Sequence, residues 1–149
     1  MTLIPNNAKI NRSLVENPDG TTSQQVIVTG GIGSSNANIS IGVATEPISA
    51  VQVIRADVGN GVAIAEPDTF DNANAIGITI TAAPLAGDVK YITSGELHDS
   101  SLFFTEGVPL YLSSNGGITD IPPVTGFLLL LGTAITNGIS VNIQQPIEL

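Results

Sequence analysis

The chain has 149 residues, of which 42% are hydrophobic and only 11% charged, and its formal net charge is −9. This length favours one globular domain around a single core, or one domain with an arm. Four basic residues against thirteen acidic ones exclude nucleic-acid binding through a basic face, and the absence of cysteine excludes thiolate catalysis, disulfides and zinc knuckles.

The first 24 residues differ in composition from the rest of the chain. They hold four asparagines, two prolines and two of the four basic residues. This composition predicts an extended N-terminal arm over residues 1–24 that becomes ordered on a partner. Residues 25–149 are predicted to form a β domain. A sub-boundary is expected near residues 30–38, where the run GGIGSSNAN is small and polar.

Short segments rich in Val, Ile, Leu, Thr and Tyr are separated by glycines and prolines at short intervals. This pattern is typical of many short strands joined by turns, and helical periodicity is nearly absent. The predicted fold is all-β, a compact β-barrel or β-sandwich of short antiparallel strands with the extended N-terminal arm. The predicted strands are residues 25–29, 37–43, 48–55, 62–65, 75–81, 89–92, 102–104, 110–112, 127–135 and 139–143.

Four Asp-Gly or Asn-Gly pairs predict tight turns, because these residues tolerate the positive φ angles of such turns. The pairs lie at 19–20, 60–61, 115–116 and 137–138. The run SSNGGIT at 113–119 predicts a hairpin between PLYL and a short strand. That strand ends at Pro122-Pro123, since paired prolines do not fit a central ladder.

Two parts of the predicted β domain echo each other. NGVAIAEP, followed later by AIGITITAAPLAGDVKYITSGEL, contains a glycine-started strand, a turn, the pair Ile76-Gly77 and a second strand. EGVPLYLSSNGGITDIPP, followed by LLGTAITNGISVNI, repeats that order with Leu131-Gly132 in the equivalent place. Two explanations of this sequence similarity are open. Either two similar β units close one barrel, or the same turn residues occur in both places although the chain contains no structural repeat.

The single histidine, His98, is the available general base, and it lies in the turn-like sequence GELHDSS. Asp99, Ser100 and Ser101 supply the other residue types of a Ser–His–Asp grouping. Adjacent residues on one loop rarely converge in that way, and no G-x-S-x-G elbow is present. We therefore interpret His98 as an exposed loop histidine and predict that the chain is not an enzyme.

Oxygen ligands are concentrated in the sequence EPDTFDNAN. Glu66, Asp68 and Asp71 are weak candidates for a hard cation such as calcium, but the spacing lacks the glycine and terminal glutamate of an EF-hand loop. A solvated acidic loop is the favoured interpretation. The run GGIGSSN lacks both the P-loop lysine and the last glycine of a dinucleotide fingerprint, so no cofactor is predicted.

The sequence given ends in Pro146-Ile147-Glu148-Leu149, with two aliphatic residues after a proline that closes a strand. We expect Pro146, Ile147 and Leu149 to dock either on a neighbouring subunit or on their own barrel. The run FLLLL at 127–131 is apolar on both faces of a strand. One face can fill the core while the other meets a second sheet or a second chain, and both features predict an oligomer.

No apolar stretch approaches the roughly 18 residues that suggest a membrane span. The N-terminal sequence also lacks the basic and apolar regions of a secretory signal. We therefore expect no membrane partner and synthesis in the cytoplasm.

The ordered series AIGIT, AAPLAGDVKYITSGEL, FTEGVPLYLSSNGGITDIPPVTGF, LLGTAI and VNIQQPIEL resembles a β-domain of tailed-bacteriophage virion proteins, over about residues 50–149. That domain recurs in head decoration (cement) proteins, head-fibre proteins and other fibre-type proteins. The resemblance implies a non-enzymatic capsid decoration protein, a homotrimer that binds the major capsid protein or another virion protein on the head surface and is assembled in the host cytoplasm. The alternative that it implies is a fibre, collar or adsorption module that recognises a host glycan or anchors another fibre protein.

The same resemblance implies that an N-terminal arm makes the contact with the virion. Its candidate contact residues are then Ile4, Ile10, Arg12 and Leu14. The resemblance carries over no catalytic residue.

Overall fold

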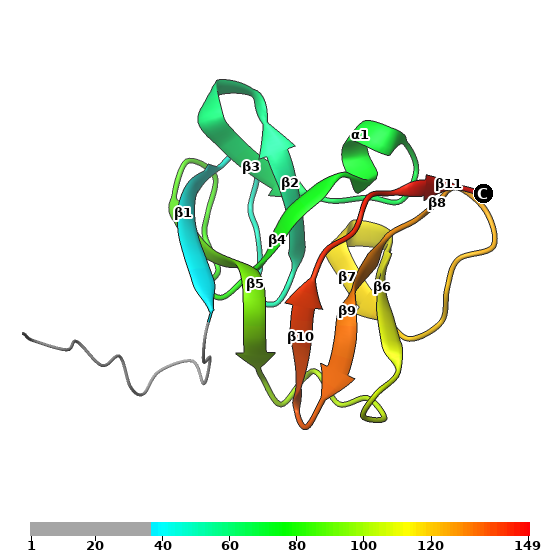
Figure 1. Cartoon of the computed structure of the whole chain (residues 1–149). Helices are drawn as coiled ribbons and strands as arrows, with labels where there is room; N and C mark the ends of the chain where they lie inside the picture. The colour runs from blue at the N-terminus through cyan, green and yellow to red at the C-terminus, as the bar shows by residue number, and fades with distance from the viewer. Residues whose placement is uncertain (1–36) are drawn as a thin grey trace, which may run out of the picture. The chain divides into compact units, whose positions relative to one another are not determined.

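The computed structural model describes residues 37–149, so the predicted arm, the Asp-Gly turn at 19–20 and the predicted strand 25–29 lie outside it. The described residues form an all-β unit, which confirms the predicted fold class (Figure 1). The strands are β1 (Asn38–Ala44), β2 (Val53–Asp57), β3 (Gly61–Ile64), β4 (Ala75–Thr79), β5 (Asp88–His98), β6 (Pro109–Ser113), β7 (Gly117–Thr119), β8 (Phe127–Leu128), β9 (Leu130–Ile135), β10 (Gly138–Asn142) and β11 (Ile147–Glu148). One α-helix, α1 (Phe70–Ala73), and two 3-10 turns, η1 (Val58–Asn60) and η2 (Ser114–Gly116), connect them.

Five strands close a small barrel. The order β1-β3-β2-β4-β5 returns to its start because β1 pairs with β5 as well as with β3. The β1–β3 pair is parallel, and the other ladders of the barrel are antiparallel. The prediction of antiparallel strands therefore misses one pair. Parallel neighbours need a long crossover, which the chain between β1 and β3 provides by running through β2.

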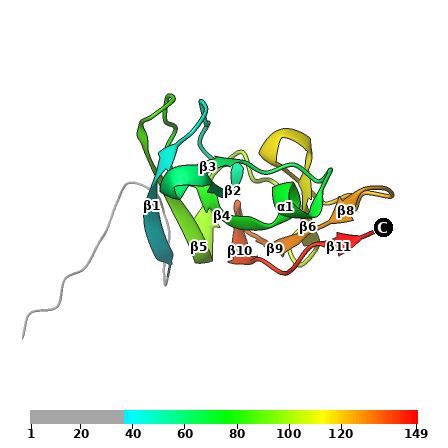
Figure 2. The ribbon, with the colours of Figure 1, turned by 90° about the horizontal axis from the view of Figure 1, so that it is seen from above.

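Strand β5 joins the barrel to the second half of the unit. Its first part pairs with β1 and β4, and residues 94–98 pair with β10. The sheet continues through β10-β9-β6-β7, and β8 and β11 form a separate two-stranded ladder (Figures 1 and 2). The predicted strand 89–92 was too short, because Gly95 continues the ladder opposite Val141 instead of starting a turn.

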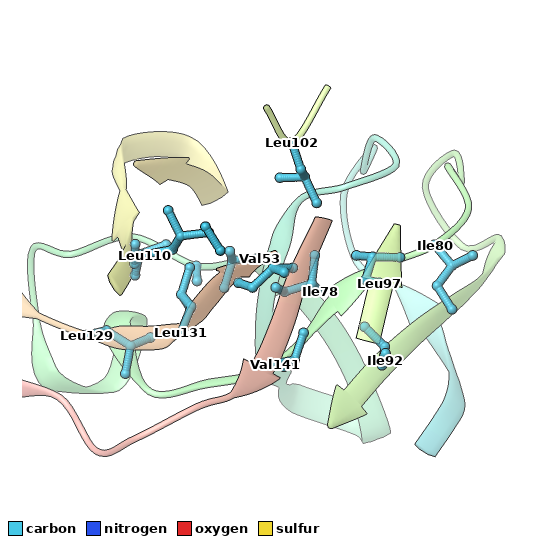
Figure 3. Packing of buried hydrophobic residues seen from close by; sticks show 14 of the residues in the cluster. Val53, Ile78, Ile80, Ile92, Leu97, Leu102, Leu110, Leu129, Leu131 and Val141 are labelled. Atoms are coloured by element: carbon cyan, nitrogen blue, oxygen red, sulfur yellow. The ribbon is translucent and has the colours of Figure 1, made fainter. Parts of the chain in front are cut away.

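Two hydrophobic clusters, not the single core expected from length, lie on opposite faces of β2 and β5. The barrel encloses Ala44, Ile48, Ile54, Val62, Ala83 and Val89. The second half encloses a larger cluster that includes Val53, Ile78, Ile92, Leu97, Leu102, Leu110, Leu112, Leu129, Leu131, Ile139 and Val141 (Figure 3). The neighbours Val53 and Ile54 are both fully buried but belong to different clusters, because successive side chains of a strand point to opposite faces.

The hairpins β2–β3 and β6–β7 have the same structure. In each, the last pair of the ladder joins a residue to a glycine four positions later, Asp57 to Gly61 and Ser113 to Gly117. Each turn contains two consecutive residues with positive φ, which are Gly59 and Asn60 in the first and Asn115 and Gly116 in the second. The turn predicted at 115–116 is confirmed. The turn predicted at 60–61 lies one residue earlier, because Gly61 has a φ of −89° and already belongs to β3.

A glycine and a register shift also recur at one place in both halves. Ile54 pairs with Gly77 in the β2–β4 ladder, Leu110 pairs with Gly132 in the β6–β9 ladder, and the register shifts directly after both pairs. Recurrent turn chemistry does not explain a shift in the middle of two ladders. The echo in the sequence is therefore a structural repeat of two similar β units, and these build two cores instead of closing one barrel.

The run FLLLL is covered by its own chain. Leu129 and Leu131 are fully buried in the larger cluster, and Phe127 and Leu128 are half-buried in the ladder with β11. The ring of Phe127 meets that of Phe70 edge to face at 6.3 Å between centroids. Phe127 packs against the larger cluster as well, and Leu128 and Leu130, on the other face of the strand, are half-buried.

Candidate interaction surfaces

Strand β1 presents its large apolar side chains to solvent. Ile39, Ile41 and Val43 are 50%, 64% and 44% exposed, and we call these three residues the β1 face. The alternate positions are small, and Gly42 and Ala44 lie toward the barrel interior. The usual arrangement of a half-buried strand is thus reversed.

The packing around Gly42 explains this reversal. A β-carbon at Gly42 would lie 2.9 Å from Cγ1 of Val62 and 3.4 Å from Cε1 of Tyr91. Side chains from β3 and β5 therefore fill the barrel beneath β1 and leave no room for large side chains from β1 itself. Aliphatic side chains gathered on an outward face are typical of a surface that a partner covers.

Charged residues of β5 flank the β1 face. Lys90 lies opposite Ile41, and Asp88 lies opposite Val43; both charged residues are exposed. Leu85 is also exposed. It lies in a loop that is bound to the end of β1, because the Ala86 N–H donates to Ala44 O at 2.7 Å. The β1 face is thus an apolar stripe with one charge of each sign at its border.

The C-terminal segment docks on its own chain through its backbone. Ile147 pairs with Leu128, and the Leu149 N–H donates to Gly126 O at 2.9 Å. Pro146 is buried, whereas the side chains of Ile147 and Leu149 are 60% and 52% exposed. This surface lies at the end of the unit opposite to β1 (Figures 1 and 2).

An apolar groove of about 440 Å³ lies beside β7. Its lining is uncharged and comes from Pro67, the end of β6, β7 and the segment after it: Leu112, Ser113, Ser114, Thr119, Ile121, Pro122, Pro123 and Val124. Ile121 and Val124 are strongly exposed at its border. The groove suits an uncharged, partly apolar segment better than a charged one.

The acidic loop is organised around the start of α1. The Thr69 hydroxyl accepts the Asn72 N–H at 3.2 Å, and Asp68 Oδ1 accepts the Asn72 side-chain amide at 2.8 Å. Within residues 37–149, no three His, Cys, Asp or Glu side chains lie close enough to hold a metal ion. The structure therefore does not bring Glu66, Asp68 and Asp71 together as a ligand set.

Asp71 instead lines a second groove, of about 480 Å³, with Arg55 and Asp57. Arg55 Nη1 lies 3.7 Å from Asp57 Oδ1. The Thr45 hydroxyl donates to Asp57 Oδ2 at 2.7 Å. This hydrogen bond, followed by one from the Val58 N–H and the charge of Arg55, holds the pKa of Asp57 below its usual value.

His98 is the last residue of β5, so its placement in a loop was wrong. Its Nε2 lies 3.3 Å from Glu96 Oε1, and its Nδ1 lies 3.2 Å from Thr136 O. The N–H and hydroxyl of Ser101 both donate to Asp99 Oδ1, at 2.9 and 2.7 Å, and they lower the pKa of Asp99. The Ser101 hydroxyl is therefore directed to Asp99 and not to His98.

Sequence reasoning did not find the β1 face. The alternation of aliphatic and small residues over 39–44 predicts a strand, but it does not tell which side of the strand is buried. The candidate arm residues Ile4, Ile10, Arg12 and Leu14 lie outside the described residues. Of the predicted contact residues, Pro146, Ile147 and Leu149 are placed, with Pro146 buried against the chain.

The chain matches no protein-family model, and no curated protein matches it. No helix within residues 37–149 is long and apolar enough to cross a membrane.

Proposed function

We propose that the chain is a non-enzymatic structural protein of a tailed-phage virion, a capsid decoration or cement protein that binds the head surface as a homotrimer and stabilises it. The observation that carries the proposal is the β1 face. Each Å² of apolar surface that a partner covers contributes about 25 cal/mol to the free energy of binding. The ordered motifs that resemble virion β-domains supply the class of partner.

The rigidity of the barrel supports this role. β1 is held by ladders to β5 and β3, so its outward side chains are already in place before a partner binds. A preformed surface loses less conformational entropy on binding than a mobile one. A protein that binds only the assembled shell stabilises that shell by mass action.

The first test is the native mass of the full chain by light scattering. We expect about three times the 15.2 kDa of one chain, and we expect Ile41→Asp to lower this mass. Val58→Asp is the matched control, because Val58 is an exposed aliphatic residue at the tip of a hairpin. A monomer at every concentration would contradict self-assembly.

The second test is co-sedimentation of the chain with the heads of its source phage. A decoration protein binds at many positions over each head, and Ile41→Asp is expected to reduce the number of bound copies. Unchanged binding by Ile41→Asp would remove the β1 face from the proposal. No binding at all would contradict a role on the head.

A fibre, collar or adsorption module is the second candidate. The exposed Ile147 and Leu149 favour it, because their ladder lies at one end of the unit (Figure 1), where another fibre protein could attach. This candidate predicts few bound copies at one place on the virion, or binding on an array of host glycans. Dense labelling over whole heads and an array without hits would argue against it.

A further inference from the structure

The two repeats differ at the outer edge of one hairpin. In the first repeat, β1 runs parallel to β3, with Val43 opposite Gly61. Thr45 extends the contact, since its N–H donates to Val62 O at 2.9 Å and its hydroxyl donates to Asp57 at 2.7 Å. The outer edge of β3 is therefore covered.

In the second repeat no strand of residues 37–149 lies at the equivalent edge. Among the described strands, β7 pairs with β6 alone. Leu112 lies opposite Ile118, and the Leu112 N–H points away from β7, where it donates to Leu129 O at 3.1 Å. In an antiparallel ladder Ile118 must then direct its own N–H and C=O away from β6. Within residues 37–149 no backbone partner is found for either group, and we call this edge of β7 the open edge.

The chain itself turns away from this edge. Residues 94–98 of β5 lie beside β10 as β1 lies beside β5 in the first repeat. After His98 the chain turns, and the Leu102 N–H donates to Asp99 O at 2.9 Å. Leu102 is buried in the larger cluster, but none of the backbone hydrogen bonds found in residues 37–149 joins this turn to β7.

We infer that the open edge of β7 is a strand-docking site and that residues 25–29 of a second copy occupy it. This inference rests on the proposed homo-oligomer and names the segment that joins its copies. Residues 25–29, QVIVT, are the one predicted strand outside the described range. Residues 21–36 carry no charge, which matches the uncharged groove beside β7. Main-chain pairing to a sheet edge supplies affinity, and the adjoining groove supplies specificity.

The first repeat indicates how the segment lies. Residues 43–45 cover the edge of β3 and have the sequence Val-Ala-Thr, and residues 27–29 have the sequence Ile-Val-Thr. Ser113 takes the place of Asp57 in the repeat. In the equivalent geometry Thr29 lies beside Ser113, as Thr45 lies beside Asp57.

The placement of β1 indicates that the segment at the edge of β7 comes from a second copy and not from the same chain. Residues 30–37 lead from the segment directly into β1, and β1 and β7 lie on opposite sides of β5 and β10 (Figure 1). A segment passed to the next copy makes a heterologous contact, and such contacts close into a ring when the rotation fits. Closure after three copies gives the proposed homotrimer.

The natural absence of cysteine allows a direct test by disulfide cross-linking of the full chain. Thr29→Cys and Ser113→Cys are made as two single variants, mixed as unfolded chains, refolded together and oxidised. We expect a cross-linked dimer that contains one chain of each variant, because a disulfide requires Cα atoms within about 7 Å. Thr29→Cys mixed with Val58→Cys is the control, since Val58 lies at the tip of the hairpin whose edge is already covered, and no mixed dimer is expected.

Two outcomes overturn the inference. The second experiment oxidises a double variant, one chain that carries both Thr29→Cys and Ser113→Cys. A disulfide within its single chains, without mixed dimers in the first experiment, would show that the segment docks on its own copy. No disulfide in either experiment would show that it does not dock at β7. A native trimer that binds heads but gives no cross-link contradicts the strand exchange alone, whereas cross-linked oligomers that do not bind heads contradict the proposed function alone.

A further variant tests the same docking without introducing a cysteine. Ile27→Asp, in the full chain, places a charge in the segment that we expect to lie against the uncharged groove. We expect its native mass to fall to that of one chain while its circular dichroism spectrum is unchanged. An unchanged native mass would contradict docking.

Discussion

Gly77 and Gly132 occupy equivalent places in the two repeats, and each lies directly against a backbone carbonyl of the next strand. A β-carbon at Gly77 would come within 2.6 Å of Ile92 O, and one at Gly132 would collide with Ser140 O. Each of these carbonyls belongs to the residue that pairs with the position after the glycine. The repeat therefore extends to close backbone contacts between neighbouring strands.

Replacing either glycine by alanine should destabilise the fold. The added methyl group meets a backbone atom that belongs to a ladder, so the strands must separate locally, at a cost of about 1–3 kcal/mol. Gly132→Ala should cost more than Gly77→Ala, because its contact is closer. Urea unfolding measures the stability of both variants, and Ser100→Ala, at an exposed position, is the control. A urea midpoint of Gly132→Ala equal to that of the unchanged chain would contradict the steric effect of the added methyl group.

Thr79→Val should be destabilising although it preserves shape. Thr79 is fully buried, and its hydroxyl accepts the Gln52 N–H at 2.9 Å and donates to Ser49 O at 2.6 Å. Valine leaves both backbone groups without this partner, at a cost of about 2 kcal/mol. Thr79→Ser keeps the hydroxyl and should recover most of the loss in thermal or urea unfolding. Equal stability of the valine and serine variants would argue against the hydrogen bonds as the cause.

The contact between Thr45 and Asp57 should make stability depend on pH in the acid range. The pKa of Asp57 is lowered in the folded chain, so folding favours the carboxylate. Its contribution is complete above the unfolded-state pKa of about 3.9, and it is lost as the pH falls through the folded-state pKa. Thr45→Val should raise the pKa of Asp57, and its effect on stability should vanish at the acid end. An NMR titration of the Asp57 carboxyl measures the shift, and an unchanged pKa in Thr45→Val would refute the cause.

Replacement by alanine should change the stability of the fold very differently at two isoleucines. Ile54 is fully buried in the barrel, whereas Ile41 is 64% exposed on the β1 face. Ile54→Ala should cost about 3 kcal/mol, and Ile41→Ala should change the stability of the dilute chain by less than about 0.5 kcal/mol. Urea unfolding at low concentration separates them. A large loss in Ile41→Ala would mean that the β1 face serves the fold and not a partner.

Local chemistry made much of the fold predictable. Asn-Gly pairs and β-branched runs located most strands, since turn geometry and strand preference act within a few residues. The sequence did not show that β5 continues through Gly95, because that extension depends on β10, which lies far along the chain. The predicted strand 102–104 was wrong for a local reason, since the Leu102 N–H bonds to Asp99 O within a turn and not to a neighbouring strand.

The candidate surfaces were less predictable than the strands. The aliphatic end of the sequence was recognised, but its backbone docks on its own chain while Ile147 and Leu149 stay exposed. The outward direction of Ile41 depends on Val62 and Tyr91, which occupy the space beneath Gly42. Such an effect arises only when three strands are assembled, so no pattern within β1 reveals it.

The two clusters share β2 and β5, and this has a consequence for how the unit unfolds. Loss of the barrel would expose Ile54 and Val89, and it would also loosen the strands that carry Val53 and Ile92 into the other cluster. Neither half can melt while the other keeps a complete sheet. We therefore expect residues 37–149 to lose their structure in one cooperative transition, in spite of having two separate cores.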